Sequence, residues 1–348
     1  GVGFGRLKSA QVSAPVEAAV PSLPIYSGTS KALHLRITPQ EPLLIGGIKS
    51  RRTNYMVSRQ ELTGGLIKGA LAAALNEDHG VIPVTRPLDA SCAPDYPGFE
   101  TLVKHFSSIR VTHARPAFVG GPRPIRLPLS AVEYGEDESR IGDVALSNER
   151  TPLVHNRHSP AYYGDAKKLD QYEDLAEPVE LFVTRSESND VSQRTAQGQL
   201  FTYQFYAPYT YAPYTKEKQP IEWVCNVDFG SVSESSERRA AVQQFAAAVQ
   251  QHLHRLGKLG RAVTVSVKDG PAASEANNRA LIEEGIALVT LQSDAVMIAP
   301  DVVRSLPLGQ DLHESYAEYW HALSGGALTL DDFFAHQGFE GGYRYHRY

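Results

Sequence analysis

Residues 236–267 read SERRAAVQQFAAAVQQHLHRLGKLGRAVTVSV, and this stretch decides which fold the chain can adopt. Apolar side chains first recur at intervals of three and four residues, which predicts an amphipathic helix over residues 236–256 with one face packed on a sheet. Gly257 follows as the expected end of this helix, because glycine readily takes the conformation of a helix C-cap. The pattern then alternates every second residue over 261–267, which predicts a strand. The apolar stripe of the helix consists of Val242, Phe245, Ala246, Val249, Leu253 and Leu256.

Three other stretches predict strands, and one predicts a second helix. Residues 32–38 alternate apolar and polar side chains, whereas residues 200–206 and 221–229 are rich in aromatic and β-branched residues. The order strand, helix, strand, strand, helix, strand is that of the ferredoxin-like fold, which also underlies the RNA recognition motif (RRM). We therefore expect an α+β fold in which the strands at Ala32, Leu200, Ile221 and Arg261 share one sheet. The second predicted helix spans residues 61–76, and its apolar side comprises Leu62, Leu66, Ala70, Ala73 and Leu75.

The segments outside this pattern define the expected domain organisation. Residues 1–30 are rich in proline and small side chains and show no period, which predicts a linker after the tail of a preceding module. Residues 79–185 are irregular, with many prolines and glycines, so we expect a large insertion with hairpins inside a domain that spans residues 31–270. Residues 271–348 hold two short apolar runs and a predicted helix over 312–323, which indicates a C-terminal α+β extension.

The composition of the 348-residue chain limits the class of protein. Hydrophobic residues make up 42% of it and charged residues 21%, and no apolar run approaches the ~18 residues needed to span a bilayer. This pattern predicts a soluble protein with no membrane partner. Cys92 and Cys225 are too few and too far apart for a disulfide framework or a zinc knuckle, so we expect a reducing, cytoplasmic location and no bound metal.

A candidate phosphate-binding surface comes from cations that cluster beside glycines. The net charge of −5 argues against a general affinity for nucleic acid, yet cations outnumber acids between residues 46 and 68. Glycine N–H groups near a helix N-terminus attract anions, and neighbouring cations add a long-range attraction to phosphate. The alternative interpretation is a glycine turn beside a solvated charged face. The predicted RNA-binding residues of this stretch are Gly46, Gly47, Lys49, Arg51, Arg52, Gly64, Gly65 and Lys68.

A second glycine element, residues 256–261, joins the long predicted helix to its following strand. A helix cap followed by a turn accounts for Gly257, but it does not explain why Lys258 and Arg261 flank Gly260. Arg194 lies in a polar loop before the strand at Leu200, where it is either a further RNA contact or a solvated loop residue. We add Lys258, Gly260, Arg261 and Arg194 to the predicted RNA-binding residues.

Residue patterns typical of enzymes are few. His155 and His158 form the one cluster that resembles a metal-free ribonuclease site, where an imidazole acts as base or acid on a 2′-hydroxyl. A polar loop contact is the alternative, because no pattern indicates a group that orients either ring. His252 and His254 are two residues apart on a predicted helix and point to different faces, which makes them poor joint metal ligands. With no dinucleotide, Walker or zinc-hydrolase motif in the sequence, we predict no cofactor, metal or catalytic residue.

Several of these motifs together resemble the RAMP superfamily of CRISPR effector proteins. Residues 42–47 (PLLIGG) resemble the family's turn after the first strand, and residues 64–75 (GGLIKGALAAAL) resemble its first helix. Residues 186–201 are similar to the family segment that ends in Leu-Phe, and residues 256–261 to the glycine-rich loop after its second helix. Within the superfamily the chain looks most like the subtype III-D backbone subunit that caps the complex at the 5′ handle of the guide RNA. Residues 1–6 resemble the glycine-rich end of a preceding RAMP module, which implies a fusion of two backbone units.

The resemblance implies a scaffold that binds guide RNA (crRNA) in a type III antiviral effector ribonucleoprotein. Its implied partners are other RAMP backbone subunits and the large subunit, with target RNA contacted indirectly. Filament-forming relatives cleave target RNA with an acid expected near the turn after the first strand, but residues 46–55 contain no Asp or Glu. We therefore expect no catalysis. The alternatives are a metal-independent, guide-processing endoribonuclease of the same fold that uses His155 or His158, and a protein-only adaptor.

Overall fold

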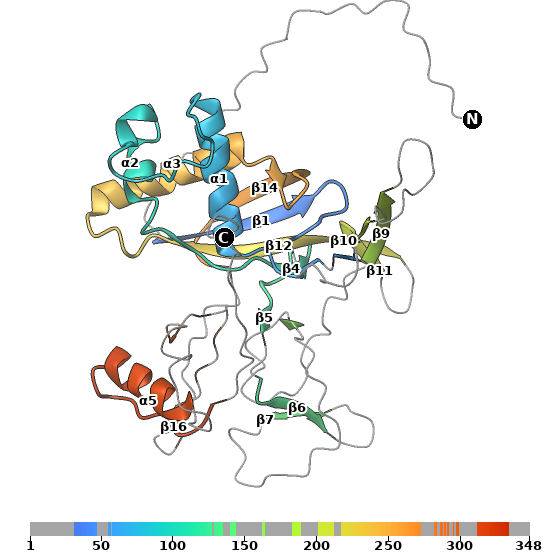
Figure 1. The fold of residues 1–348 in the computed structure, drawn as a ribbon, viewed down its shortest axis with the longest axis vertical. Coiled ribbons are helices and arrows are strands. Elements are labelled where there is room, and N and C mark those ends of the chain that lie inside the picture. The colour runs from blue at the N-terminus through green and yellow to red at the C-terminus, as the bar shows by residue number, and fades with distance from the viewer. Residues whose placement is uncertain are drawn as a thin grey trace, which may run out of the picture.

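The computed structural model describes residues 31–46, 55–56, 58–126, 129–134, 140–143, 162–163, 183–188, 201–211, 217–272 and 312–333, with a few positions between 282 and 298. Within these residues the chain has an α+β fold, as the sequence predicts. Three helices cover one face of an antiparallel sheet (Figure 1).

The main sheet has seven strands, and all its pairs are antiparallel. β1 (Ala32–Pro39) lies at its centre, between β12 (Lys218–Asp228) and β14 (Arg261–Asp269). The predicted strands at Ala32, Ile221 and Arg261 therefore share one sheet. The remaining strands pair with β12 or β14; they are β3 (Arg110–Val111), β4 (Arg115–Phe118) and β11 (Tyr209–Tyr211) on β12, and β13 (Arg255–Leu256) on β14.

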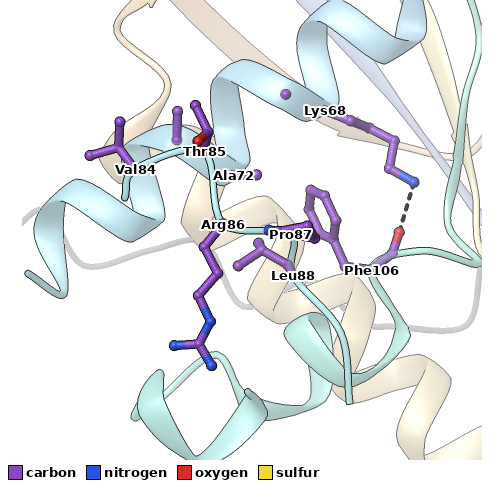
Figure 2. A pocket seen from close by; sticks show the side chains of 10 residues that line it. Lys68, Ala72, Val84, Thr85, Arg86, Pro87, Leu88 and Phe106 are labelled. Carbon is purple, nitrogen blue, oxygen red and sulfur yellow. Dashed lines mark hydrogen bonds between the residues drawn. The ribbon is translucent and has the colours of Figure 1, made fainter. Parts of the chain in front are cut away.

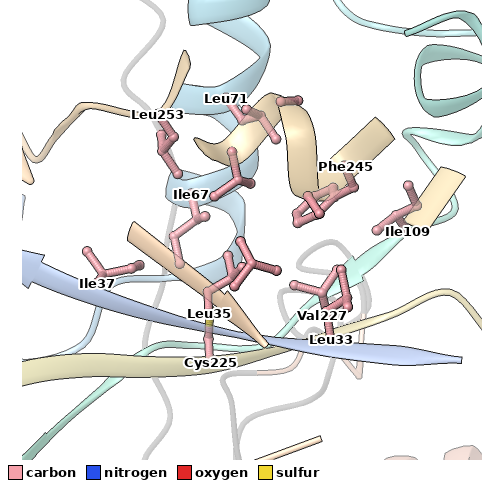
Figure 3. Packing of buried hydrophobic residues seen from close by; sticks show 14 of the residues in the cluster. Leu33, Leu35, Ile37, Ile67, Leu71, Ile109, Cys225, Val227, Phe245 and Leu253 are labelled. Atoms are coloured by element: carbon pink, nitrogen blue, oxygen red, sulfur yellow. The ribbon is translucent and has the colours of Figure 1, made fainter. Parts of the chain in front are cut away.

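The hydrophobic core lies between this sheet and the helices. Leu33, Leu35 and Ile37 alternate along β1, are fully buried, and point toward α1 (Gly64–Asp78) and α3 (Ser235–His252) (Figure 3). α2 (Glu100–His105) follows the 3₁₀ helix η1 (Ala93–Asp95) and also packs on α3. The helix residues in this core include Ile67, Leu71, Leu75, Leu102, Val242, Phe245 and Val249.

Smaller sheets lie outside the main one. β10 (Phe201–Tyr206) pairs with β9 (Val183–Ser188) and, in parallel, with β2 (Tyr55–Met56). α5 (Leu312–Leu323) confirms the predicted C-terminal helix. The other short strands pair in twos: β6 (Ala131–Tyr134) with β7 (Arg140–Asp143), β5 (Ile125–Arg126) with β8 (Tyr162–Tyr163), and β15 (Ile282–Glu283) with β16 (Ile286–Ala287).

The expected place of the Leu200 strand in the main sheet is wrong. Among the described residues, β10 reaches the segment after β1 through a bridge between Leu43 and Tyr206, but it belongs to the sheet of β2 and β9. β3 and β4 pair with β12 instead. Pro208 O still accepts from Ile221 N–H at 3.1 Å, but from this residue on β12 pairs with β4 and β1, so β10 does not pair with β12. Residues 93–118, which fall in the predicted insertion, thus supply two helices and two strands of the main fold, while the division into domains stays a prediction.

The long predicted helix ends four residues earlier than expected, since α3 stops at His252 and the prediction extended to residue 256. The chain then pairs back on β14, where Val263 N–H donates to His254 O at 2.9 Å. Leu253 and Leu256 are buried as predicted, although neither lies on the helix.

The predicted apolar side of the first helix is also partly wrong. α1 begins after Thr63, whose side-chain oxygen accepts a hydrogen bond from Leu66 N–H at 3.2 Å. Leu62 precedes the helix and pairs with Ala114. The residues buried on α1 are Gly64, Ile67, Leu71, Leu75 and Asn76, while Leu66, Ala70 and Ala73 of the predicted side are partly exposed.

Gly64 determines this orientation of α1, because its missing side chain lets the helix approach β3. A Cβ on Gly64 would lie 1.8 Å from Val111 O. Replacing Gly64 with alanine is therefore expected to lower the free energy of unfolding by about 1–3 kcal/mol, the usual effect of extra atoms in a packed site. Urea denaturation followed by circular dichroism measures it.

Gly69→Ala on the same helix is the matched control. A Cβ at Gly69 meets nothing within 4 Å, and alanine favours the helix by about 0.5–1 kcal/mol. Equal unfolding midpoints for the two variants would contradict the close approach of α1 to β3.

Candidate nucleic-acid interface

The turn between β13 and β14 is held in one conformation by two glycines. Gly257 has φ +79° and Gly260 has φ +58°, both in the left-handed region that favours glycine. A Cβ on Gly257 would lie 2.5 Å from Leu44 O and 3.1 Å from Leu43 Cδ1. Gly260 N–H donates to Gly257 O at 3.1 Å. The turn therefore has a fixed shape and packs closely on the segment after β1.

A backbone hydrogen bond joins the two glycine segments of the sequence. Lys258 N–H donates to Leu44 O at 2.9 Å, so the turn lies beside residues 43–46, which end at Gly46. Ile45 is fixed in turn by Ser58, whose Oγ accepts from Ile45 N–H at 2.8 Å and contacts Ile45 O at 3.0 Å. Gly46, Lys258, Gly260 and Arg261 of the predicted set thus belong to one surface.

Two cations of this turn are exposed. Lys258 extends over Met56, with its Nζ 3.4 Å from Met56 Sδ. Arg255 on β13 is also exposed, and its Cδ approaches the turn at Gly260. Because both charges remain in contact with water and neither forms an ion pair within 4 Å of a described carboxylate, they can attract phosphate.

Arg261, by contrast, is partly neutralised. Its Nη1 donates to Glu41 Oε2 at 2.6 Å, and its guanidinium lies 5.5 Å from the centre of the Phe205 ring. Ala262 N–H donates to Glu41 Oε1 at 3.0 Å. This backbone hydrogen bond, followed by Arg261, holds the pKa of Glu41 below its usual value. Glu41 is therefore ionised near neutral pH and competes with any phosphate for Arg261.

The predicted residues on α1 have structural partners. Gly64 is buried against β3, so packing accounts for it, whereas Gly65 is exposed with open space around it. Lys68 Nζ donates to Phe106 O and Ile109 O, each at 2.7 Å (Figure 2 shows the first bond). Burial lowers the pKa of Lys68. Phosphate binding by Lys68 would compete with these two bonds at the end of α2.

The other predicted residues lie outside the described part of the chain, and their roles stay predictions. They are Gly47, Lys49, Arg51, Arg52 and Arg194, together with His155 and His158 of the endoribonuclease alternative.

Two residues of this surface were missed in the sequence. Arg255 lies within the long predicted helix, whereas in the structure it begins β13, which pairs with β14. The sequence carries no signal that the chain leaves the helix before this residue. Glu41 and Arg261 are 220 residues apart, and no sequence pattern links them. The position of Glu41 between Pro39 and Pro42 weakly indicates a fixed turn, but it does not indicate which cation the carboxylate would meet.

The face of the sheet opposite the helices is partly closed by the chain itself. Arg36 forms a short ion pair with Glu222, and the exposed fractions of the two side chains are 11% and 5%. Arg36 also donates to Gly121 O at 2.9 Å, and Gly120 N–H donates to Glu222 Oε1 at 2.8 Å. Residues 120–121 therefore cover this part of β12. On β14 the same face carries exposed side chains, namely Thr264, Ser266 and Lys268.

Within the described ranges, no cluster of three or more His, Cys, Asp or Glu side chains is arranged to hold a metal ion. Cys92 and Cys225 are both buried and are not joined by a disulfide. None of the described helices has the length and apolar character to cross a membrane.

The chain was compared with known sequences and solved structures. No protein-family model matches the sequence, and no curated protein matches it. Two chains from Type III-B Cmr-beta structures are similar in structure. The one bound to cognate target RNA and AMPPnP, state 1, has 14% identity and a TM-score of 0.36, and the similarity covers 68% of this chain and 63% of that one. The one bound to cognate target RNA has 12% identity and a TM-score of 0.34, and the similarity covers 70% of this chain and 98% of that one.

This chain therefore spans less than two thirds of the length of the first of these structures.

Gly257→Ala is expected to release the turn from residues 43–46. The added Cβ clashes with Leu44 O, so the bond from Lys258 N–H to Leu44 O is lost, and hydrogen exchange at this amide should accelerate at least about tenfold. Gly260→Ala is the control, because its Cβ would meet only Arg255 Cδ, at an ordinary contact distance of 4.0 Å, and it suffers only the left-handed strain of about 1–2 kcal/mol. Equal protection of Lys258 N–H in both variants would contradict the contact.

Proposed function

We propose that this chain is a guide-RNA-binding scaffold subunit of a type III CRISPR effector ribonucleoprotein, of the kind that caps the backbone at the 5′ handle of the guide. Its proposed partners are the guide RNA, neighbouring RAMP backbone subunits and the large subunit, with target RNA contacted through them. The proposal assigns it no catalytic residue, metal or cofactor, and a cytoplasmic location.

The observation that carries the proposal is the hydrogen bond from Lys258 N–H to Leu44 O. It joins the two RAMP-like motifs, residues 42–47 and 256–261, which lie far apart in the sequence. The contact depends on Gly257, which has a positive φ and leaves no room for a Cβ next to Leu44 O. Such a requirement is expected if the two motifs form one site, and it has no evident reason if they are unrelated turns. A surface of glycines and exposed cations binds phosphates whatever the base, which suits a guide whose spacer sequence varies.

We also propose that residues 31–270 form a ferredoxin-like RAMP domain. The strand order β4, β12, β1, β14 supports it, with α1 between β1 and β4 along the chain and α3 between β12 and β14. In this arrangement β3 and β4 take the place of the second strand. In this proposal residues 1–30 are the tail of a preceding module with a linker, and residues 271–348 are a C-terminal extension, so both lie outside the RAMP domain.

Co-purification with the other subunits of the complex tests the function. A short RNA with a fixed, repeat-derived 5′ end should travel with the chain, and a purified assembly without RNA would refute the proposal. The pure chain should leave a repeat-containing precursor RNA intact in the presence of a chelator. Cleavage that is lost in His155→Ala or His158→Ala would favour the endoribonuclease instead.

Changing Arg255 and Lys258 together to glutamine is expected to weaken binding of single-stranded RNA to the same extent for different sequences. Each lost phosphate contact lowers the slope of log K against log salt by ~0.7, because fewer counterions are released. Fluorescence anisotropy at several salt concentrations measures the slope. A second double variant, Arg110→Gln with Arg239→Gln, removes the same charge from exposed positions on β3 and α3. Identical slopes for both variants would show that the turn does not contact phosphate.

Glu41→Gln is expected to have the opposite effect. Removing this carboxylate releases Arg261 and takes one negative charge from the surface, so RNA affinity should rise by about threefold, as for an exposed ion pair. Glu314→Gln on α5 changes the net charge equally and serves as control. Unchanged affinity in Glu41→Gln, or an equal gain in the control, would remove Arg261 from the RNA-binding surface.

A further inference from the structure

A groove lies on the outer side of α1. None of the residues that line it belongs to the turn between β13 and β14. The groove has a volume of about 350 Å³, and apolar side chains dominate its lining. On α1 it is lined by Gly69, Ala72 and Ala73, and the loop at 84–88 and Phe106 line it from the other elements. Figure 2 shows Ala72, Leu88 and Phe106 around this space. The small residues of α1 leave the space open, since a Cβ at Gly69 would meet nothing within 4 Å.

A large apolar side chain is exposed in the lining of this groove. Val84 is 44% exposed although it lines the groove. Ile82, two residues earlier along the chain, is 89% exposed. An exposed large side chain in an open apolar groove is typical of a surface that another molecule covers.

The cation at one side of the groove has no carboxylate partner among the described residues. Lys68 is half-buried, and burial is the sole cause that lowers its pKa, with no contribution from a nearby acid. Its ammonium makes two short bonds, to Phe106 O and Ile109 O, and its third contact, to Ser107 O, is long at 3.5 Å. The ammonium also lies 5.0 Å from the centre of the Phe106 ring, so carbonyl dipoles and an aromatic ring surround this charge and no described carboxylate neutralises it.

The second cation of the groove differs in this respect. Arg86 Nη1 lies 3.0 Å from Asp95 Oδ2, so its charge is already paired. An incoming carboxylate would therefore be attracted to the Lys68 side of the groove.

We propose that this groove docks a segment of a partner protein in which a large apolar side chain stands next to an Asp or Glu. The apolar side chain fills the space over Gly69, Ala72 and Ala73, and the carboxylate lies beside the Lys68 ammonium, where it replaces the long contact to Ser107 O. RNA fits this surface less well, because its charged backbone would lie on an apolar lining. Docking here goes beyond RNA binding, and it assigns Lys68 to a protein partner and not to the guide.

Three short peptides with blocked ends test the chemistry of the occupant: Gly-Glu-Leu-Leu-Glu-Gly, its Gln version Gly-Gln-Leu-Leu-Gln-Gly, and its Ser version Gly-Glu-Ser-Ser-Glu-Gly. Binding to the full chain is followed by NMR on ¹³C-methyl alanine, with Ala72 and Ala73 as reporters. The Glu-Leu peptide should shift both methyl signals in a saturable way. The Ser version should leave them unchanged, and the Gln version should bind roughly threefold more weakly or worse.

A Cβ at Gly69 meets nothing within 4 Å, and leucine favours a helix more than glycine does, so Gly69→Leu should stay folded and place its side chain in the groove. It should weaken the Glu-Leu peptide by about tenfold or more, as for a blocked anchor pocket. Gly69→Ala, which stabilises the helix but leaves most of the space, should bind the peptide like the unchanged chain. Lys68→Met keeps the stem of the side chain and should abolish the preference for the Glu over the Gln peptide.

Three results would overturn the proposal. They are methyl signals that no peptide shifts, shifts that the Ser version reproduces, and full binding in Gly69→Leu. RNA binding by Gly69→Leu is measured in parallel. If the variant binds RNA normally while losing the peptide, docking is a separate property; if the chain binds the peptide but no RNA, the proposed function fails and the docking site stands.

Discussion

The close contact between Gly257 and the backbone of Leu44 is the constraint on which the candidate interface depends. Only a hydrogen atom fits between the turn and Leu44 O, and only glycine adopts the required positive φ without strain. The hairpin of β13 and β14 can therefore pack against the segment after β1. Because the chain leaves α3 at His252 to form this hairpin, Arg255 on β13 and Lys258 in the turn lie beside the segment after β1. One small residue thus brings cations and backbone N–H groups from distant parts of the sequence onto one surface.

The elements with a local signal were predictable from the sequence, and those that depend on distant contacts were not. β1, β12, β14 and α5 lie where their apolar periods place them. The end of α3 was missed because Leu253 and Leu256 continue the helical spacing and are in fact buried, so burial alone does not distinguish the helix from the hairpin that follows. The face of α1 depends on the approach of Gly64 to Val111 O, which no period of α1 encodes.

In the candidate site, too, the environment of a single charged side chain depends on distant contacts that the sequence does not reveal. Lys68 and Lys258 look alike in the sequence, since each is directly beside a glycine, Gly69 or Gly257, in a stretch that holds further glycines and cations. In the structure Lys68 is half-buried and holds the carbonyls that follow α2, whereas Lys258 is exposed above Met56. The difference is one of desolvation. A cation that has lost water is satisfied by fixed dipoles and shows a lowered pKa, and it is less available to a mobile phosphate than an exposed one.

The chemistry of the sheet decides which way a nucleic acid at this turn would extend. An RRM stacks bases on the open face of its sheet. Here the β12 side of that face is covered, because Arg36 and Glu222 pair with each other and with residues 120–121, and Asn226 Oδ1 accepts from Ala272 N–H at 3.0 Å. The charges there are compensated within the chain, so they offer little to phosphate. β14 begins at the turn and keeps its hydroxyls and Lys268 exposed along the same face. A strand of RNA bound at the turn would therefore find polar surface along β14 and not across the sheet.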